Sequence, residues 1–164
     1  MLDRVLRPIK ARIAAAGIRH SIYIDDGIIL APTKMDIQAA IKLVHGSLQS
    51  AGFELSASKS DKAEQVSQEK EYLGFIIDTS RMSLTAPPRK MSRLHKILDN
   101  EEQQRGSLRR AKEVASVIGK IVALQPALGP VVQLLSRAIQ RDLSEAVDKW
   151  GWKARFPLLS LIHI

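Results

Sequence analysis

The sequence has 164 residues, of which 45% are hydrophobic and 26% are charged, as in ordinary globular proteins. It contains no cysteine, which excludes disulfides and thiolate metal sites. No apolar run approaches the roughly 18 to 20 residues of a membrane span, and the N-terminus lacks a signal-peptide pattern. We therefore expect an intracellular protein of the cytoplasm or nucleus with no membrane partner.

The positive charge is concentrated in the second half of the chain. Residues 1–84 carry 11 Lys and Arg against 10 Asp and Glu, whereas residues 85–164 carry 14 against 7. Such an asymmetry suggests that the basic half has a polyanion partner. A solvated helical surface explains the same charges equally well, so charge alone does not choose between the two.

The N-terminal part predicts a helix followed by a β-hairpin. Apolar side chains recur at helical spacing over residues 2–16, and Gly17 is placed to end this helix. Two β-rich runs, residues 20–24 and 28–31, then flank the turn Asp25-Asp26-Gly27. The pattern predicts antiparallel strands with both aspartates exposed at the apex.

A second helix and further strands are predicted next. Thr33, with an acidic residue three positions later, has the pattern of a helix start, and Gly52 stands where the helix should end. A strand is predicted over residues 53–57, and a second hairpin from residues 72–77 and 82–85. Helices and hairpins in this order predict an α+β fold.

Pro87-Pro88 is the sharpest boundary in the chain. The β patterns vanish after it, and three helices are predicted near residues 88–102, 107–125 and 130–149, with Ser107 as the N-cap of the middle one. The second half is therefore expected to be entirely helical.

The last residues are expected to lie outside the fold. Leu159–Ile164 resembles the translation of a sequencing adaptor, as a cloning scar would. Residues 151–164 are accordingly predicted to be a tail that is partly artefactual.

Two adjacent aspartates at a hairpin apex allow two interpretations. In the first interpretation they form only a polar turn, since Asp and Gly tolerate the backbone conformations that tight turns require. Rigid, exposed carboxylates are also the oxygen ligands that Mg²⁺ prefers. The tetrapeptide Tyr23-Ile24-Asp25-Asp26 alone leaves both interpretations open.

This tetrapeptide between two apolar strands resembles the catalytic motif of reverse transcriptases, and the following segments come in that family's order. A helix and a strand end near Lys59, where the family carries a lysine close to the phosphates of the incoming nucleotide. Tyr72-Leu73-Gly74-Phe75 is similar to the hairpin that grips the primer end, and the helices after Pro87-Pro88 resemble the thumb. In detail the sequence resembles retrotransposon enzymes of the DIRS and gypsy types, and three stretches suggest the DIRS side: Gly17-Ile18-Arg19, Leu73–Asp78 and Ile118–Leu124.

The resemblance implies an RNA-directed DNA polymerase, a nucleotidyltransferase, with a partial palm in residues 1–86 and a helical thumb in residues 87–150. It implies catalytic roles for Asp25, Asp26 and Lys59, with two Mg²⁺ ions held in part by the two aspartates. Its partners would be an RNA or DNA template with a primer, and deoxynucleoside triphosphates. Residues expected to contact nucleic acid are Tyr23, Leu73, Gly74, Arg89, Lys90, Arg93 and Lys96, followed by a second basic run of Arg105, Arg109, Arg110 and Lys112.

The sequence also departs from the family. It starts at the helix before the aspartate pair, so the first catalytic aspartate, the fingers and the RNase H domain are expected to be missing. We therefore expect the isolated chain to be inactive. The alternative is a non-catalytic, nucleic-acid-binding remnant of a retroelement, in which the aspartates form only a turn and Lys59 is a surface lysine.

Overall fold

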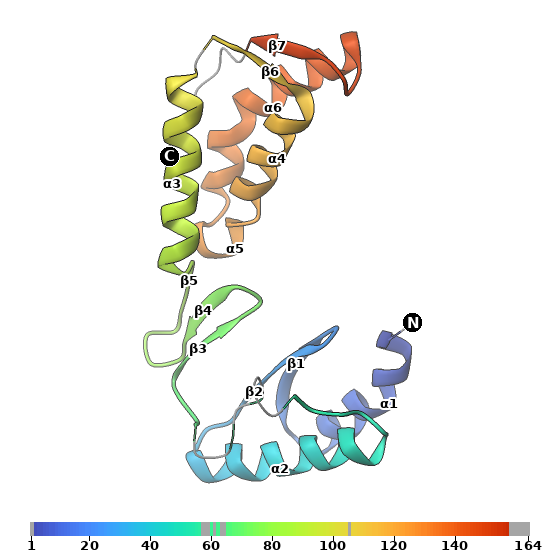
Figure 1. Ribbon diagram of the computed structural model, residues 1–164. Helices are drawn as coiled ribbons and strands as arrows, with labels where there is room; N and C mark the ends of the chain where they lie inside the picture. The colour runs from blue at the N-terminus through green and yellow to red at the C-terminus, as the bar shows by residue number, and fades with distance from the viewer. Residues whose placement is uncertain (1, 57–59, 61, 63–64, 105, 158–164) are drawn as a thin grey trace. The chain divides into compact units, whose positions relative to one another are not determined.

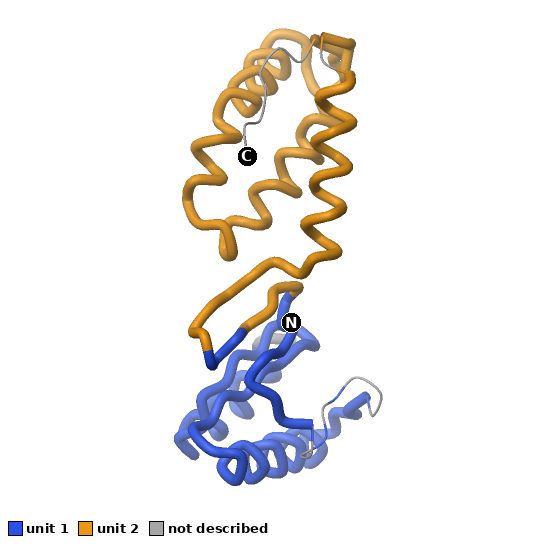
Figure 2. The backbone as a smooth tube through the Cα atoms, turned by 90° about the vertical axis from the view of Figure 1, so that its left-hand side faces the viewer, with its two compact units in different colours: residues 1–73, 78–80 blue, residues 74–77, 81–164 orange. Residues whose placement is uncertain are grey.

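A computed structural model describes residues 2–56, 60, 62, 65–104 and 106–157 of the chain (Figure 1). The described residues form helices and short antiparallel strands, so the predicted α+β class is confirmed. They divide into unit 1, residues 1–73 and 78–80, and unit 2, residues 74–77 and 81–164 (Figure 2). The assignment of palm and thumb to residues 1–86 and 87–150 stays a prediction.

Unit 1 contains the predicted helices and the first hairpin. Its elements are α1 (Leu2–Ala15), β1 (Arg19–Tyr23), β2 (Asp26–Leu30), α2 (Lys34–Ser50) and β3 (Glu69–Tyr72).

Local signals place the ends of both helices in unit 1. Gly17 has a φ of 73° just after α1, a backbone conformation that glycine adopts without strain. The Thr33 hydroxyl accepts a hydrogen bond from the Asp36 N–H at 3.1 Å and donates one to the Asp36 carboxylate at 2.7 Å. Gly52, with a φ of 83°, follows α2. These three boundaries confirm the sequence prediction.

The strand predicted over residues 53–57 is wrong for its described part, residues 53–56. The Phe53 N–H donates to the Leu48 carbonyl at 3.0 Å, and the Gly52 N–H donates to the Gln49 carbonyl at 2.9 Å. Both bonds satisfy carbonyls that the helix end leaves without partners. Phe53 therefore helps to end α2 and packs its side chain against the core, and its segment forms no strand over residues 53–56.

One face of the β1–β2 hairpin covers the core of unit 1. Leu6, Ile9 and Ile13 of α1 and Val44 of α2 are buried together. Ile22 of β1 and Ile29 of β2 pack against this cluster from the hairpin, together with Ile18, Leu48 and Phe53. Because side chains alternate between the faces of a strand, the neighbours of Ile22 along β1 point away from the core.

Unit 2 is mainly helical. Its elements are β4 (Phe75–Asp78), β5 (Ser83–Thr85), α3 (Pro88–Gln103), β6 (Leu108–Arg110), α4 (Ala111–Val122), α5 (Gln125–Leu128), α6 (Val131–Trp150) and β7 (Arg155–Pro157). Strands β3, β4 and β5 are neighbours in one sheet, and β6 pairs antiparallel with β7.

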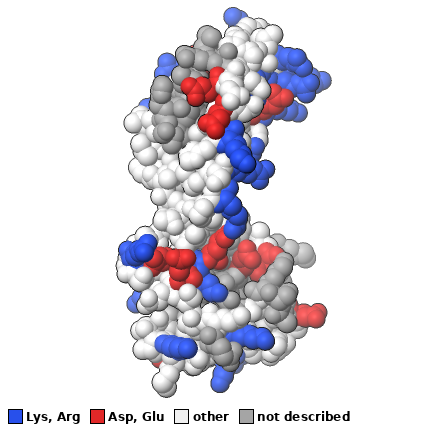
Figure 3. Space-filling model, turned by 60° about the vertical axis from the view of Figure 1, so that its left-hand side comes forward, with Lys and Arg blue, Asp and Glu red and all other residues white. Residues whose placement is uncertain are grey.

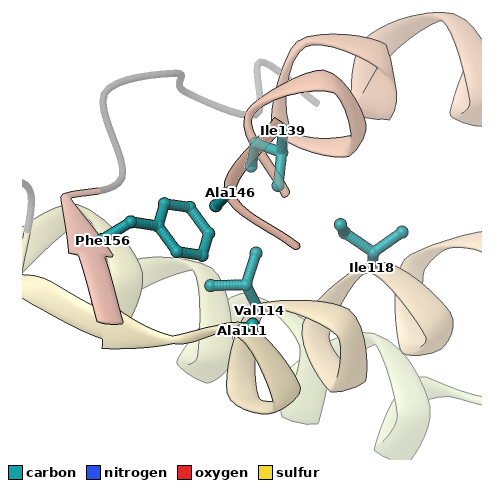
Figure 4. Packing of buried hydrophobic residues seen from close by; sticks show 6 residues of the cluster. All are labelled: Ala111, Val114, Ile118, Ile139, Ala146 and Phe156. Carbon is teal, nitrogen blue, oxygen red and sulfur yellow. The ribbon is translucent and has the colours of Figure 1, made fainter. Parts of the chain in front are cut away.

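Helix α4 contributes to two hydrophobic clusters. Val114 and Ile118 pack with Ile139 and Ala146 of α6 and with Phe156 of β7 (Figure 4). The other cluster joins α3, α4 and α6, and its buried residues are Leu94, Val117, Ile121, Leu124 and Val132. Lys112, Ser116 and Lys120 of α4 are exposed.

The β6–β7 pair corrects three expectations for the second half of the chain. This half is not entirely helical, and Ser107 is not an N-cap, because residues 108–110 form a strand and α4 begins at Ala111. Residues 151–157 are not a tail, since Phe156 is 4% exposed in the core. The adaptor-like residues 158–164 lie outside the described residues.

None of the helices in the described part of the chain combines the length and the apolar character that crossing a membrane requires.

Candidate functional site

The carboxylate turn joins β1 to β2, which pair antiparallel with Tyr23 opposite Asp26 as their last pair. The connection is therefore only two residues long, Ile24 and Asp25, and Asp26 is already the first residue of β2. Both aspartates are exposed. The predicted antiparallel hairpin with an exposed aspartate pair is confirmed, with the second strand beginning two residues earlier than expected.

Ile24 has an unusual backbone conformation. Its φ is 55°, a value that is uncommon outside glycine and a genuine outlier for a β-branched residue. Asp25 is not among the residues with positive φ, so the loop resembles a type II′ turn, which normally carries glycine at its first central position. Ile24 is 58% exposed, so packing does not explain the choice of residue. Strain of this kind clusters at functional sites.

The turn presents Tyr23 and Asp26 on the face of the hairpin that is turned away from the core. Directly opposite residues of an antiparallel pair lie on the same face. Ile22 packs against the core, so Tyr23 and its partner Asp26 lie on the other face. Tyr23 is 59% exposed. Asp25, in the loop, is also open to solvent.

The two carboxylates fit the hard oxygen ligands that Mg²⁺ requires. Neither Asp25 nor Asp26 makes a hydrogen bond or ion pair with a described residue, so their oxygens are available to an outside ligand. Mg²⁺ usually takes one or two carboxylates and completes its shell with water and substrate phosphates. No third acidic or metal-binding side chain joins them among the described residues. The pair is thus a partial ligand set.

Tyr72 connects the predicted primer-contact segment to the carboxylate hairpin within unit 1. Its hydroxyl donates to the Ser21 carbonyl at 3.1 Å and lies 3.1 Å from the Ser21 hydroxyl. Ser21 is two residues before Tyr23 on β1, and so lies on the same face. The two segments are 51 residues apart in sequence, and no sequence pattern predicts this contact.

Leu73 and Gly74 form the two-residue connection between β3 and β4. Both have positive φ, 49° and 74°, as type I′ hairpin turns require. Leu73 is 43% exposed. A methyl group at Gly74 would collide with the ammonium end of Lys90, which also lies 4.9 Å from the centre of the Phe75 ring. Lys90 therefore has a different environment from the other basic residues predicted to contact nucleic acid.

A basic groove of about 580 Å³ runs between α3 and α4. We call it the α3–α4 groove. Figure 3 shows Lys and Arg side chains in a column along unit 2. Residues from both helices line the groove at spacings of three or four, and five of the lining residues are cations. The charged lining residues are Arg93, Lys96, Glu101, Arg109, Lys112, Glu113 and Lys120.

Among the described residues, only one of these five cations forms ion pairs with carboxylates. Arg109 lies 2.9 Å from Glu101 and 3.6 Å from Glu113, and it donates to the Gln104 side chain at 2.7 Å. The other four form no ion pair with any described residue, which leaves them open to an outside anion: Arg93, Lys96, Lys112 and Lys120.

The α3–α4 groove contains four of the predicted nucleic-acid contacts, Arg93, Lys96, Arg109 and Lys112, and adds one residue, Lys120. Arg93 and Lys96 line it, whereas Arg89 and Lys90 do not. The sequence prediction missed Lys120, although its spacing from Lys112 and Ser116 along one helix face was a usable signal. The predicted catalytic residue Lys59 and the predicted contact Arg105 lie outside the described residues.

Residues 1–77 match the family model described as reverse transcriptase (RNA-dependent DNA polymerase). The match includes the carboxylate turn and extends through Leu73 and Gly74, and it shows that this part of the chain is similar to that family. Neither the curated proteins nor the solved structures contain a match to the chain.

Proposed function

We propose that the chain is part of an RNA-directed DNA polymerase of a DIRS- or gypsy-like retroelement, with residues 1–86 as palm and residues 87–150 as thumb. The observation that carries the proposal is the exposed aspartate pair on a two-residue hairpin turn, inside the segment that matches the family. Its substrates would be deoxynucleoside triphosphates and a primer on an RNA or DNA template.

Asp25 and Asp26 would hold Mg²⁺ in this function. When bound, two such ions activate the primer 3′-hydroxyl and neutralise charge on the transferred phosphoryl group. The chain's own contribution is to hold the two carboxylates exposed, and without competing partners among the described residues, at the end of an antiparallel hairpin. The role of Lys59 at the leaving phosphates stays a prediction.

Metal binding can be tested with Mn²⁺, which replaces Mg²⁺ at carboxylate sites and broadens nearby NMR signals. We expect the amide signals of residues 23–27 to broaden, and Asp25→Asn with Asp26→Asn to abolish the effect. Asp99→Asn, which removes one exposed carboxylate from unit 2, is the control and should leave the broadening unchanged. Broadening spread over all acidic residues would contradict a site at the hairpin.

The four unpaired cations of the α3–α4 groove would bind the sugar-phosphate backbone of the primer–template duplex. Binding through phosphates ignores sequence and weakens with salt, because each contact releases counterions. A polymerase needs this kind of affinity, since it must accept any template.

A salt titration of duplex binding tests the groove. Replacing Arg93, Lys96, Lys112 and Lys120 with Ala should lower affinity for all duplexes and flatten the slope of log K against log salt, by up to about 3.6 at roughly 0.9 per contact. A charge-matched control replaces Arg137, Arg141, Lys149 and Lys153, which are exposed and lie outside the groove. Equal effects of the two variants would show that only net charge matters.

We propose that the isolated chain does not extend a primer. Two-metal catalysis needs more ligands than the two carboxylates that the described residues bring together. A primer-extension assay with Mg²⁺ should therefore show no incorporation. Incorporation that Asp25→Asn abolishes would contradict this proposal.

The small number of carboxylates that the described residues bring together also favours a second candidate, a nucleic-acid-binding remnant without catalysis. With only two carboxylates brought together, the groove could retain its affinity while the hairpin is merely a polar turn. The two candidates differ in the Mn²⁺ experiment, because the remnant needs no metal at Asp25 and Asp26.

A further inference from the structure

We propose that Lys90 is a positioning residue: its ammonium group holds Gly74 and Phe75 in a constant position against the start of α3. Lys90 does not contact phosphate in this proposal. All three residues belong to unit 2. The inference rests on the proposed function only in so far as Gly74 is the residue expected at the primer end.

The ammonium group of Lys90 is held against an aromatic ring. Its Nζ lies 4.9 Å from the centre of the Phe75 ring, within the distance at which a cation is attracted to the face of the ring. Phe75 is partly buried and packs against the cluster that contains Leu94 and Ile121. The Phe75 ring therefore packs against the core of unit 2, and the ammonium group of Lys90 lies over the ring.

Gly74 provides the space that Lys90 occupies. A Cβ atom at this position would collide with the Nζ and Cε atoms of Lys90. The φ of 74° is a second, independent reason for glycine, because it is strained for any residue with a Cβ. The end of the lysine could swing aside, so a side chain at position 74 would separate Lys90 from Phe75.

Lys90 is distinct from the basic residues of the α3–α4 groove. It is half-buried and does not line the groove, whereas Arg93 and Lys96 are exposed and do. Lys90 lies in the first turn of α3, two residues after Pro88 and three after Pro87, which is fully buried. The start of α3 is thereby fixed, and a side chain anchored there can hold the backbone of the turn in a constant position.

The first test is spectroscopic and uses the full 164-residue chain. Protons above the face of a ring are shifted upfield, so the ε-methylene signals of Lys90 should lie upfield of those of other lysines. Phe75→Leu, which keeps an apolar side chain on the cluster, should return them to the ordinary position. An ordinary position in the unchanged chain would overturn the proposal.

The second test measures hydrogen exchange at the Gly74 and Phe75 amides. Lys90→Met keeps the length of the side chain but removes the cation, and should speed exchange about two- to fivefold, as expected for loss of a cation–π contact. Lys90→Arg, which retains a cation able to cover the ring, should restore protection. Equal exchange in the unchanged chain and in Lys90→Met would overturn the proposal.

The third test separates Lys90 from the groove by a salt titration with a primer–template duplex. Lys96→Met should lower the slope of log K against log salt by about 0.9, whereas Lys90→Met should leave it unchanged. An equal loss of slope in both variants would overturn the proposal for Lys90. If the unchanged chain binds no duplex even at low salt, the proposed function fails, and the spectroscopic and exchange tests still decide the role of Lys90.

Discussion

Two of the hairpin turns in the described part of the chain, Tyr23-Ile24-Asp25-Asp26 and Tyr72-Leu73-Gly74-Phe75, share an unusual backbone conformation but differ in their surroundings. Each begins with a tyrosine followed by an aliphatic residue with positive φ, Ile24 at 55° and Leu73 at 49°. The second turn is anchored: the Tyr72 hydroxyl bonds to Ser21, and Lys90 lies beside Gly74. In the first turn, neither the Tyr23 hydroxyl nor either carboxylate has a hydrogen-bond or ion-pair partner among the described residues.

The difference separates a turn that serves the fold from a turn that is open to a ligand. In the second turn, glycine occupies one of the two positions with positive φ and Leu73 the other, and the contacts of Tyr72 and Lys90 hold the turn in place. The strain at Ile24 is not offset by comparable contacts among the described residues. Backbone strain that the local packing does not explain is typical of functional sites. This contrast gives stability measurements something to test.

The largest effect is expected for Gly74→Ala. A side chain at a φ of 74° that also displaces Lys90 should destabilise the chain by about 2 kcal/mol, measured by urea unfolding. Gly119→Ala, in an exposed helical position where an added Cβ would meet nothing within 4 Å, is the matched control and should stabilise by about 0.5–1 kcal/mol. The same sign for both substitutions would mean that Gly74 has no special environment.

Ile24→Asn should stabilise the chain by about 1 kcal/mol, because asparagine tolerates positive φ far better than a β-branched residue does. Ile24→Val, which stays β-branched, should leave the free energy of unfolding unchanged. A loss of stability with asparagine would show that Ile24 makes a contact that offsets its strain, and the contrast between the turns would disappear.

The smallest effect is expected for Tyr72→Phe. It removes an exposed hydrogen bond to Ser21 and should cost about 0.5–1 kcal/mol in urea unfolding. Tyr23→Phe removes a hydroxyl with no partner among the described residues and should cost nothing measurable. Equal costs for the two tyrosines would contradict the assignment of one turn as anchored and the other as open.

The sequence predicted those parts of the fold that short-range chemistry determines. The Thr33 cap, the glycines after α1 and α2, and the exposed aspartate hairpin all depend on residues within a few positions of one another. The strand predicted near Phe53 failed because β-propensity cannot reveal that its N–H closes a helix.

The remaining features depend on partners distant in sequence. Leu108–Arg110 forms a strand only because residues 155–157 lie beside it. The Tyr72–Ser21 bond and the contact of Lys90 with Phe75 likewise join segments without a shared pattern. For the site, the aspartates were found from a local motif, whereas the α3–α4 groove needed the antiparallel approach of two helices.

The β6–β7 pair determines the time at which unit 2 can be completed during synthesis. Every residue of the unit 1 core, from Leu6 to Phe53, has been added before the last two thirds of the chain are made. Phe156, by contrast, belongs to the last segment of unit 2 and packs on Ala111 and Val114. A ribosome that adds roughly 5–20 residues each second therefore exposes this apolar surface of α4 for seconds before β7 arrives. If synthesis ended before Arg155, the apolar surface of α4 would stay uncovered for the lifetime of the product. Chaperones could then bind this surface, or it could promote aggregation.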